Sequence, residues 1–407
     1  MSTQIQVSPK SASGIFGISD TAGVYTYYST LTLAMAAATS GQTIEMFADV
    51  VETGAVTVTL KNGVNINGNG HTYTLNVAGI PNAFIVANST TYSSSILNIN
   101  VVRTGSTSDL SEGCCMSIGT NVICNIDYQG SQFINLGSGV GIFVANNTTG
   151  NISNAIARSK STLGAYFIGT SAEIFTLNRC IGYGYSGGTG IRLHNGGTAN
   201  HCIGISDSGI GYFSIGNDNN CVGISSTGTG FNSTGGRSCN CTGRSISSIG
   251  YLANSAAKDN LNCVGISVSG TGIFAAFPIT NCVGISSSSP GLTLSVNGQS
   301  IYNTYAKSST SYAALGGGTS KLYGCTLISE WNNAAGYGIR GNGGAISDTI
   351  VNCTFNLSNA SAPYLFNDGV AQAISMRGNT YKGGGAFNIN LTQAIVTTED
   401  AQGNIFL

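Results

Sequence analysis

The sequence predicts an all-β solenoid, in which one chain winds into stacked coils of short parallel strands. Two recurring marks carry this prediction. A glycine followed by a large apolar residue, as in Gly211-Tyr212 and Gly230-Phe231, recurs nine or ten residues after each member of a cysteine series. Each unit therefore holds two short apolar segments separated by turns. The cysteines of this series are spaced 19 to 22 residues apart and are Cys180, Cys202, Cys221, Cys241, Cys263 and Cys282.

Units of about 20 residues favour strands over helices. They are too short for two packed helices, and glycine and β-branched residues oppose helix formation. The spaced leucines of leucine-rich repeats are missing, which leaves a parallel β-helix with strands stacked about 4.8 Å apart. Four of the cysteines open a Cys-Val/Ile-Gly-Ile-Ser segment. We expect Cys, Gly, Val and Ile to fill the narrow interior, and the Asn before most cysteines to form stacked amide hydrogen bonds.

The composition excludes several classes of protein. Of the 407 residues 42% are hydrophobic, too many for a disordered chain. Only 8% are charged and the net charge is −1, which argues against nucleic-acid binding because no basic stripe is present. The apolar stretches are far shorter than the roughly 20 residues of a membrane span. Residues 1–16 lack the apolar core of a secretion signal, so we expect synthesis in a cytoplasm without export.

The whole pattern resembles the right-handed parallel β-helix superfamily, which includes pectate-lyase-like enzymes and bacteriophage tailspikes. A short apolar helix at about 30–39, with Ser29 as its N-cap, precedes a strand at 43–47. In that superfamily such a helix caps the open end of the coil, where core and strand edges would otherwise be exposed. The resemblance implies an N-terminal extension or attachment segment at 1–28, a β-helix at 29–380 and a C-terminal cap or tail at 381–407.

The cysteine series predicts a structural ladder and no metal site. A zinc site gathers four ligands around one point, whereas this series places one sulfur in each coil. Stacked cysteines lie within disulfide range, but buried reduced thiols fit a small apolar core position better. The nearest match to a calcium-binding nonapeptide, Gly187 to Arg192, has arginine where the ligand carboxylate belongs. We expect neither a metal nor another cofactor.

Few residues qualify as a functional site. Glycosidases need paired carboxylates at defined separations, and no such pair aligns within the coils. Glu330, Asp348 and Asp368, in the region of longer C-terminal loops, remain as catalytic candidates should the protein be an enzyme. A possible ligand-binding patch on one wall would combine the side chains of Arg192, His194, Asp218 and Tyr212.

The leading hypothesis is a non-enzymatic fibre, spike or decoration protein of a bacteriophage virion, adhesive toward host-surface glycans. The resemblance implies a homotrimer, with the N-terminal segment binding other virion proteins and cell-surface polysaccharide as the ligand. Neither nucleic acid nor membrane insertion is expected. The alternative is a tailspike-type polysaccharide depolymerase, a glycoside hydrolase or lyase, with its site in a loop or between subunits. Binding to ice or minerals ranks last because Thr-x-Thr does not recur in the cysteine-marked coils.

Overall fold

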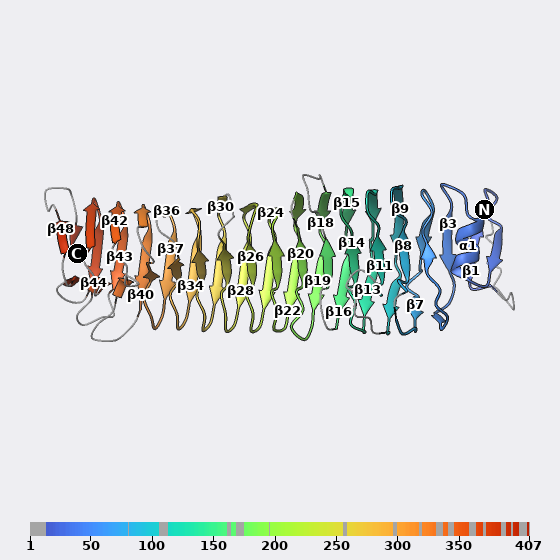
Figure 1. Cartoon of the computed structure of the whole chain (residues 1–407), viewed down its shortest axis with the longest axis horizontal. Coiled ribbons are helices and arrows are strands. Elements are labelled where there is room, and N and C mark those ends of the chain that lie inside the picture. The colour runs from blue at the N-terminus through green and yellow to red at the C-terminus, as the bar shows by residue number, and fades with distance from the viewer. Residues whose placement is uncertain are drawn as a thin grey trace, which may run out of the picture.

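The chain forms a long rod of stacked coils, with its strands running across the long axis (Figure 1). The computed structural model describes residues 14–79, 81–105, 113–160, 164–167, 175–194, 196–254, 259–295, 299–316, 320–330, 337–340, 346–357, 364–368, 372–383, 388–391, 394–398 and 405–406. Each regular coil contributes one strand to each of three parallel sheets, named here sheet 1, sheet 2 and sheet 3 in the order in which the chain passes through them from β4 onward.

The described part of sheet 1 has 16 strands, that of sheet 2 has 15 and that of sheet 3 has 18. Sheet 1 consists of β4 (Val50–Glu52), β7 (Thr72–Leu75), β10 (Asn100–Arg103), β13 (Gln132–Asn135), β16 (Ile156–Ser159), β19 (Ile181–Gly184), β22 (Ile203–Ser206), β25 (Val222–Ser225), β28 (Thr242–Ser245), β31 (Val264–Ser267), β34 (Val283–Ser286), β37 (Tyr305–Ser308), β40 (Thr326–Ser329), β43 (Thr354–Leu357), β46 (Thr380–Gly383) and β49 (Ile405–Phe406). Sheet 2 consists of β5 (Val58–Thr59), β8 (Phe84–Val86), β11 (Met116–Ile118), β14 (Ile142–Val144), β17 (Ala165–Phe167), β20 (Ile191–Leu193), β23 (Tyr212–Ser214), β26 (Phe231–Ser233), β29 (Tyr251–Ala253), β32 (Ile273–Ala275), β35 (Leu292–Leu294), β38 (Ala314–Leu315), β41 (Tyr337–Arg340), β44 (Tyr364–Asp368) and β47 (Asn388–Leu391). Sheet 3 consists of β1 (Phe16–Ser19), β2 (Tyr25–Tyr28), β3 (Thr43–Met46), β6 (Asn65–Asn67), β9 (Thr91–Leu97), β12 (Ile123–Asp127), β15 (Thr149–Ser153), β18 (Phe175–Asn178), β21 (Gly197–Asn200), β24 (Asn217–Asn219), β27 (Arg237–Cys239), β30 (Asp259–Leu261), β33 (Ile279–Thr280), β36 (Gln299–Tyr302), β39 (Ser320–Tyr323), β42 (Ile346–Val351), β45 (Gln372–Arg377) and β48 (Ala394–Thr398).

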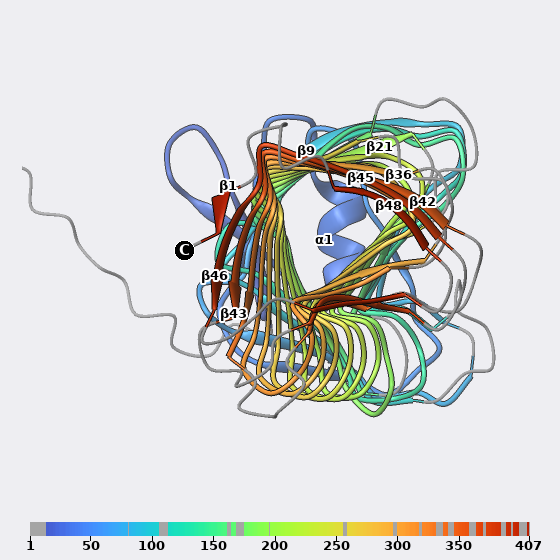
Figure 2. The same ribbon diagram turned by 90° about the vertical axis from the view of Figure 1, so that its left-hand side faces the viewer.

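A helix and a hairpin close the N-terminal end of the rod. Helix α1 (Leu31–Ala37) lies across the hollow of the coil in the end-on view (Figure 2) and buries Leu31, Ala34 and Met35. This confirms the predicted capping helix, but its N-cap is Thr30 and not Ser29. Thr30 is the extended residue next to the first turn, and its hydroxyl accepts the Leu33 N–H at 3.2 Å. Strand β1 pairs antiparallel with β2 and β3, so residues 16–28 extend sheet 3.

The corner between sheet 3 and sheet 1 turns on a single residue in the left-handed region. Asn220 has φ 54°, and His201 takes the same conformation at φ 55°. Asparagine dominates this position because its short polar side chain tolerates the left-handed region better than other non-glycine residues do. The predicted amide stacking is confirmed here, since Asn262 Nδ2 donates to Asn240 Oδ1 one coil away at 3.1 Å.

The interior of the regular coils is built from small residues on sheet 1 and large residues on sheet 2. All twelve cysteines are free, and the predicted cysteine ladder is fully buried. Burial raises the pKa of Cys124, a buried cysteine of β12 outside the ladder, to about 12, so this thiol stays protonated and unreactive at neutral pH. Cys221 Sγ donates to the Asn219 carbonyl at 3.4 Å. These thiols serve as core residues.

The prediction that Val and Ile fill the interior is wrong for the Val and Ile of the Cys-Val/Ile-Gly-Ile-Ser segments, whereas isoleucines of sheet 2 such as Ile191 and Ile273 are fully buried. Side chains alternate along a strand, so Cys221, Gly223 and Ser225 face inward while Val222 and Ile224 face outward. The large apolar residue that follows the recurring glycine, Phe231 in one coil, explains why the smaller residues of sheet 1 face inward. A Cβ added at Gly243 would lie 3.0 Å from the Cβ of Phe231, so the inner wall of sheet 1 has no room for a branched side chain.

The serine that ends each Cys-Val/Ile-Gly-Ile-Ser segment holds the following turn. Ser225 Oγ donates to the Gly209 carbonyl at 2.7 Å and accepts the Gly228 N–H at 2.9 Å. The same pair of bonds recurs in each regular coil at Ser206, Ser245, Ser267, Ser286 and Ser308.

Replacing Ser225 with alanine is expected to lower the free energy of unfolding by about 1–3 kcal/mol, because a partly buried N–H and a carbonyl both lose their partner. Denaturant titration measures the change. Ser226→Ala is the matched control, since the adjacent Ser226 side chain is exposed, and it should shift stability by less than about 0.5 kcal/mol. Equal effects of the two substitutions would contradict this role for the inward serine.

Candidate functional site

One face of the rod, the outer side of sheet 3 toward the N-terminus, is lined with hydrogen-bonding side chains that are all neutral except Asp127. Strand pairing stacks these residues in two columns, which we call the polar face. They point outward because their strand neighbours, such as Ile126 and Ile152, occupy the core. The polar face consists of Asn65, Ser93, Ser95, Asn125, Asp127, Asn151, Ser153, Thr176, Asn178, Thr198, Asn200, Asn217 and Asn219.

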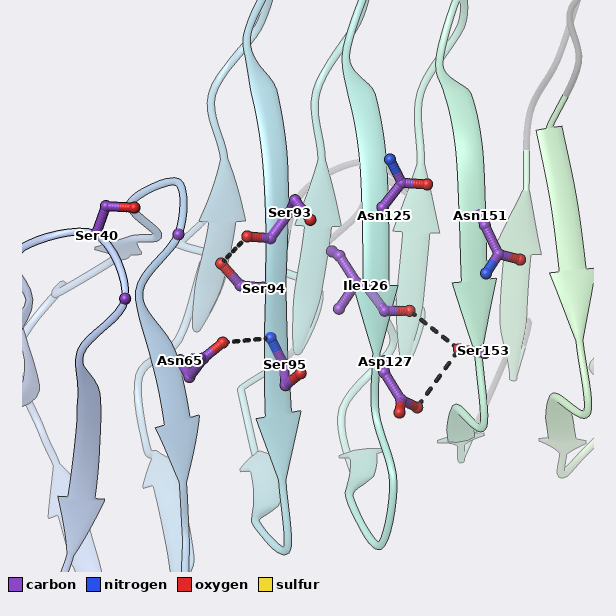
Figure 3. A pocket seen from close by; sticks show the side chains of 12 residues that line it. Ser40, Asn65, Ser93, Ser94, Ser95, Asn125, Ile126, Asp127, Asn151 and Ser153 are labelled. Carbon is purple, nitrogen blue, oxygen red and sulfur yellow. Dashed lines mark hydrogen bonds between the residues drawn. The ribbon is translucent and has the colours of Figure 1, made fainter.

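The polar face is hollowed into a groove of about 490 Å³ at its N-terminal end. Strands β6, β9, β12 and β15 form its floor, and the loop segments at Ser40 and Gly63 form one wall (Figure 3). These two loops approach closely, since a Cβ at Gly63 would lie 2.1 Å from Ser40 Oγ. Glycine at position 63 therefore shapes the wall of the groove.

Asp127 is the only charged residue among those that line the groove. Its Oδ1 accepts a hydrogen bond from Asn154 Nδ2 at 2.7 Å, and Ser153 Oγ lies 3.4 Å from the same oxygen. A second carboxylate at the separation used by glycosidases is missing from the lining residues. The groove can bind a hydroxyl-rich ligand through amides, hydroxyls and one carboxylate, but its lining lacks an acid and base pair for hydrolysis.

The structure divides the predicted ligand-binding patch into two parts. Arg192 faces outward with its guanidinium carbon 5.2 Å from the centre of the Phe213 ring, and the His194 ring lies 6.4 Å from the same ring. Burial and the nearby charge of Arg192 lower the pKa of His194. Tyr212 and Asp218 are fully buried inside the coil. The predicted single patch is therefore wrong for Tyr212 and Asp218, because both occupy inward strand positions.

Asp218 belongs to a buried polar cluster in the core. The Tyr212 hydroxyl donates to Asp218 Oδ1 at 3.0 Å, and Ser238 Oγ lies 3.5 Å from Oδ2. Burial raises the pKa of the Asp218 carboxyl well above its ordinary value. The Tyr212 ring also stacks on Phe231 at 4.8 Å between ring centres, so the carboxyl is enclosed by aromatic and hydroxyl groups.

The three predicted catalytic carboxylates belong to different parts of the coil. Glu330 follows β40 of sheet 1, Asp348 lies in β42 of sheet 3, and Asp368 ends β44 of sheet 2. Glu330 forms an ion pair with Lys307 at 2.6 Å, and the hydrogen bond from Lys307 lowers the pKa of Glu330. The side chains of Asp348 and Asp368 lie outside the described residues. The backbone thus gives no indication that the three carboxylates form one site.

Neither a cluster of metal ligands nor a membrane-spanning helix is present among the described residues. Within the described ranges, no group of three or more His, Cys, Asp or Glu side chains is arranged to hold a metal ion. The same residues include no helix that is long and apolar enough to cross a membrane.

Comparison with known proteins assigns the chain to no family. No protein-family model and no curated protein matches the chain. A solved structure, the A-module of the mannuronan C-5 epimerase AlgE6 from Azotobacter vinelandii, aligns with 11% identity over 92% of this chain and 93% of that chain, with a TM-score of 0.27. The architecture is established by the strand pairing of the chain itself. It is a parallel β-helix of the right-handed type, as the sequence predicted.

Sequence reasoning missed the polar face, although a signal was present. In the coils with a ladder cysteine, the second and fourth residues before it point outward, and they are Asn200 and Thr198 in one coil and Asn219 and Asn217 in the next. Most coils nearer the N-terminus lack the ladder cysteine, so they could not be aligned with this pattern from the sequence alone.

Proposed function

We propose that the protein is a non-enzymatic, rod-shaped component of a bacteriophage virion that binds host-surface glycans through the polar face. The observation that carries this proposal is the groove of about 490 Å³ lined by serine and asparagine with one carboxylate, Asp127. Glycan hydroxyls both donate and accept hydrogen bonds, and Ser and Asn side chains match both roles. The single carboxylate supports binding over hydrolysis.

The repeat of the rod suits a chain-like ligand. Successive strands present similar donors and acceptors about 4.8 Å apart along the polar face. A polysaccharide lying along the rod would contact several rungs at once, and the combined contacts would raise its affinity above that of a single sugar. The low charge of the chain, 8% of residues, fits recognition by neutral hydrogen bonds.

A place in a virion is supported by the resemblance and by the shape of the rod. Helix α1 and the β1–β2 hairpin close the N-terminal end of the rod (Figure 1). We assign attachment to other virion proteins to this end, through the segment 1–28, which leaves the length of the rod free for the ligand. Mass spectrometry of purified virions is expected to detect the protein, and its absence from particles would overturn this assignment.

Replacing Asp127 with alanine is expected to weaken binding of host-surface polysaccharide by roughly 10- to 100-fold, because a hydrogen bond to a charged group contributes about 1.5–3 kcal/mol. Isothermal titration with purified polysaccharide measures the affinity. Asp259→Ala is the matched control, since Asp259 is exposed on sheet 3 outside the groove and should leave the affinity unchanged.

Two outcomes would contradict the proposal. Equal affinities of the wild type and the Asp127 variant, with both folded by circular dichroism, would move the binding site away from the groove. Release of new reducing ends or unsaturated products from the polysaccharide by the wild type would establish the depolymerase alternative.

A further inference from the structure

Three aromatic side chains are gathered on the outer side of sheet 3 at the N-terminal end of the rod, and we call them the aromatic cluster. Its members are Tyr25 and Tyr27 of β2 and Phe47, which follows β3. The centres of the two tyrosine rings are 6.0 Å apart, and the Phe47 ring lies 5.3 Å from Tyr25 and 5.7 Å from Tyr27. Tyr25 is 36% exposed and Tyr27 is 38% exposed, so both are accessible to a ligand.

Gly17 of β1 lets the aromatic cluster lie directly against the backbone. A Cβ at this position would lie 2.7 Å from the Phe47 ring and 2.9 Å from the Tyr25 ring. Gly17 is buried although it faces outward, because these rings cover it. Packing therefore holds the rings in place, and a surface that is ordered before binding loses less entropy when the ligand arrives.

A carboxylate and two amides border the aromatic cluster. Glu45 pairs with Gly17 across β1 and β3, and burial together with the nearby charge of Glu45 raises the pKa of Tyr25. Glu45 Oε2 accepts a hydrogen bond from Asn69 Nδ2 at 2.8 Å, and Asn69 Oδ1 accepts one from Asn67 Nδ2 at 2.9 Å. Glu45 Oε1 has no partner among the described residues, so it can accept a hydrogen bond from a ligand.

The aromatic cluster and the groove lie on one continuous face. Strand pairing runs in the order β2, β1, β3, β6, β9 and β12, and Asn65 of β6 already lines the groove. Five strand spacings separate β2 from β12, which carries Asp127, so the aromatic cluster lies about 24 Å from that carboxylate along the rod. A ligand that contacts both must be an extended chain.

We infer that the aromatic cluster binds a pyranose ring of the same glycan that the groove holds, and that this glycan is a chain long enough to span both. The C–H groups on one face of a pyranose are weakly positive and pack on the negative faces of aromatic rings. The hydroxyls at its edge can donate to Glu45 and bond with the amide of Asn67. An apolar protein surface would instead leave the Glu45 carboxylate desolvated without a partner, which is costly. This inference rests on the glycan-binding proposal and adds a minimum length for the ligand.

Oligosaccharides made by partial acid hydrolysis of the host-surface polysaccharide, separated by size, test this inference by isothermal titration. The double substitution Tyr25→Ala with Tyr27→Ala should weaken binding of fractions longer than about 24 Å by about tenfold. It should leave unchanged the affinity of shorter fractions whose binding depends on Asp127, which also shows that the groove is intact. Tyr25→Leu with Tyr27→Leu keeps apolar bulk on β2 and should lose the same affinity, whereas Tyr25→Phe with Tyr27→Phe keeps the ring faces and should retain it.

Tyr302→Ala with Tyr323→Ala is the matched control for these variants. Those two rings also stack on the outer side of sheet 3, with 5.1 Å between ring centres, and Tyr302 is 41% exposed. They lie on β36 and β39, and β36 is eight strand spacings beyond β12, or about 38 Å. A chain that just spans the groove and the aromatic cluster cannot reach them, so the control should keep the wild-type affinity.

Three outcomes would overturn the inference, and they differ in what else they change. If the wild type binds the long fractions and the alanine and leucine variants bind them equally well, the inference fails and the glycan-binding proposal stands. If the wild type binds no fraction, both fail. If the alanine variant keeps its oligosaccharide affinity but is lost from virions, the aromatic cluster contacts another virion protein instead of a sugar.

Discussion

Replacing Gly243 with alanine is expected to destabilise the rod by about 3 kcal/mol or more. A Cβ at this inward position would lie 2.0 Å from the carbonyl oxygen of Gly250 and 2.7 Å from its carbonyl carbon. Both atoms belong to the backbone, so no side-chain rotation can relieve the overlap. The coil would have to open locally, and the stacking on the coils above and below would be strained with it. Denaturant and thermal unfolding measure the loss.

Gly54→Ala is the matched control for this substitution. The nearest atom to a Cβ at Gly54 is a methyl carbon of Val56 at 3.6 Å, which is an ordinary contact. The control should change the free energy of unfolding by less than about 1 kcal/mol. A Gly243 variant as stable as the control would show that the coils tolerate a wider cross-section than their geometry indicates.

This close approach of two backbone segments explains why each regular coil contains two recurring glycines. The glycine of Cys-Val/Ile-Gly-Ile-Ser faces the glycine that precedes the large apolar residue of the same coil, as Gly223 faces Gly230 and Gly265 faces Gly272. A Cβ at the first glycine would meet the backbone of the second, whereas a Cβ at the second would meet the backbone of the next coil, as Gly230 would meet Arg244. The spacing of nine residues between cysteine and second glycine is therefore the length of chain needed to bring the two backbones together. The repeat could be predicted from the sequence, whereas the contact between its two glycines became visible only in the structure.

The orientation of the strands could not be predicted in the same way. Alternation with a period of two separates Cys, Gly and Ser from Val and Ile, but it does not say which set faces inward. Hydrophobicity favours Val and Ile, and the structure places them outside. The space inside the coil decides the orientation, because Tyr212, Phe231 and Tyr251 from sheet 2 already fill the interior. Their rings stack with 4.8 and 5.2 Å between ring centres. That constraint depends on contacts between sheets.

The burial of Asp218 was missed for a related reason. Asp218 lies three residues before Cys221, and the left-handed corner residue Asn220 lies between them. Counting back from the inward cysteine across this corner places Asp218 inward and Asn219 outward. The equivalent residues in other coils are buried, and some of them, such as Ala199 and Ile279, are apolar, which was the available signal. A carboxyl group at this buried position is the exception, because charged residues are almost never fully buried without a partner.

Replacing Asp218 with asparagine is expected to make the rod more stable than the wild type above about pH 5, by an amount that grows with pH. Burial raises the pKa of the folded Asp218 well above its value in the unfolded chain, which is about 3.9. The contribution of this group to stability is therefore complete below about pH 4. It is lost as the pH rises, by up to about 1.4 kcal/mol per pH unit, until the folded carboxyl ionises.

Asparagine is the right probe because it has the shape of the neutral carboxyl and the coil already uses it. Asn260 stands two coils further along the same column, and its Oδ1 accepts the Tyr251 hydroxyl at 2.7 Å, as Asp218 Oδ1 accepts Tyr212. Unfolding free energies of the wild type and Asp218→Asn, measured from pH 4 to 8, should diverge steadily. The exposed control Asp207→Asn should follow the wild type at every pH. Parallel curves for Asp218→Asn and the wild type would show that the carboxyl ionises in the folded chain as it does in the unfolded chain, which would contradict the raised pKa.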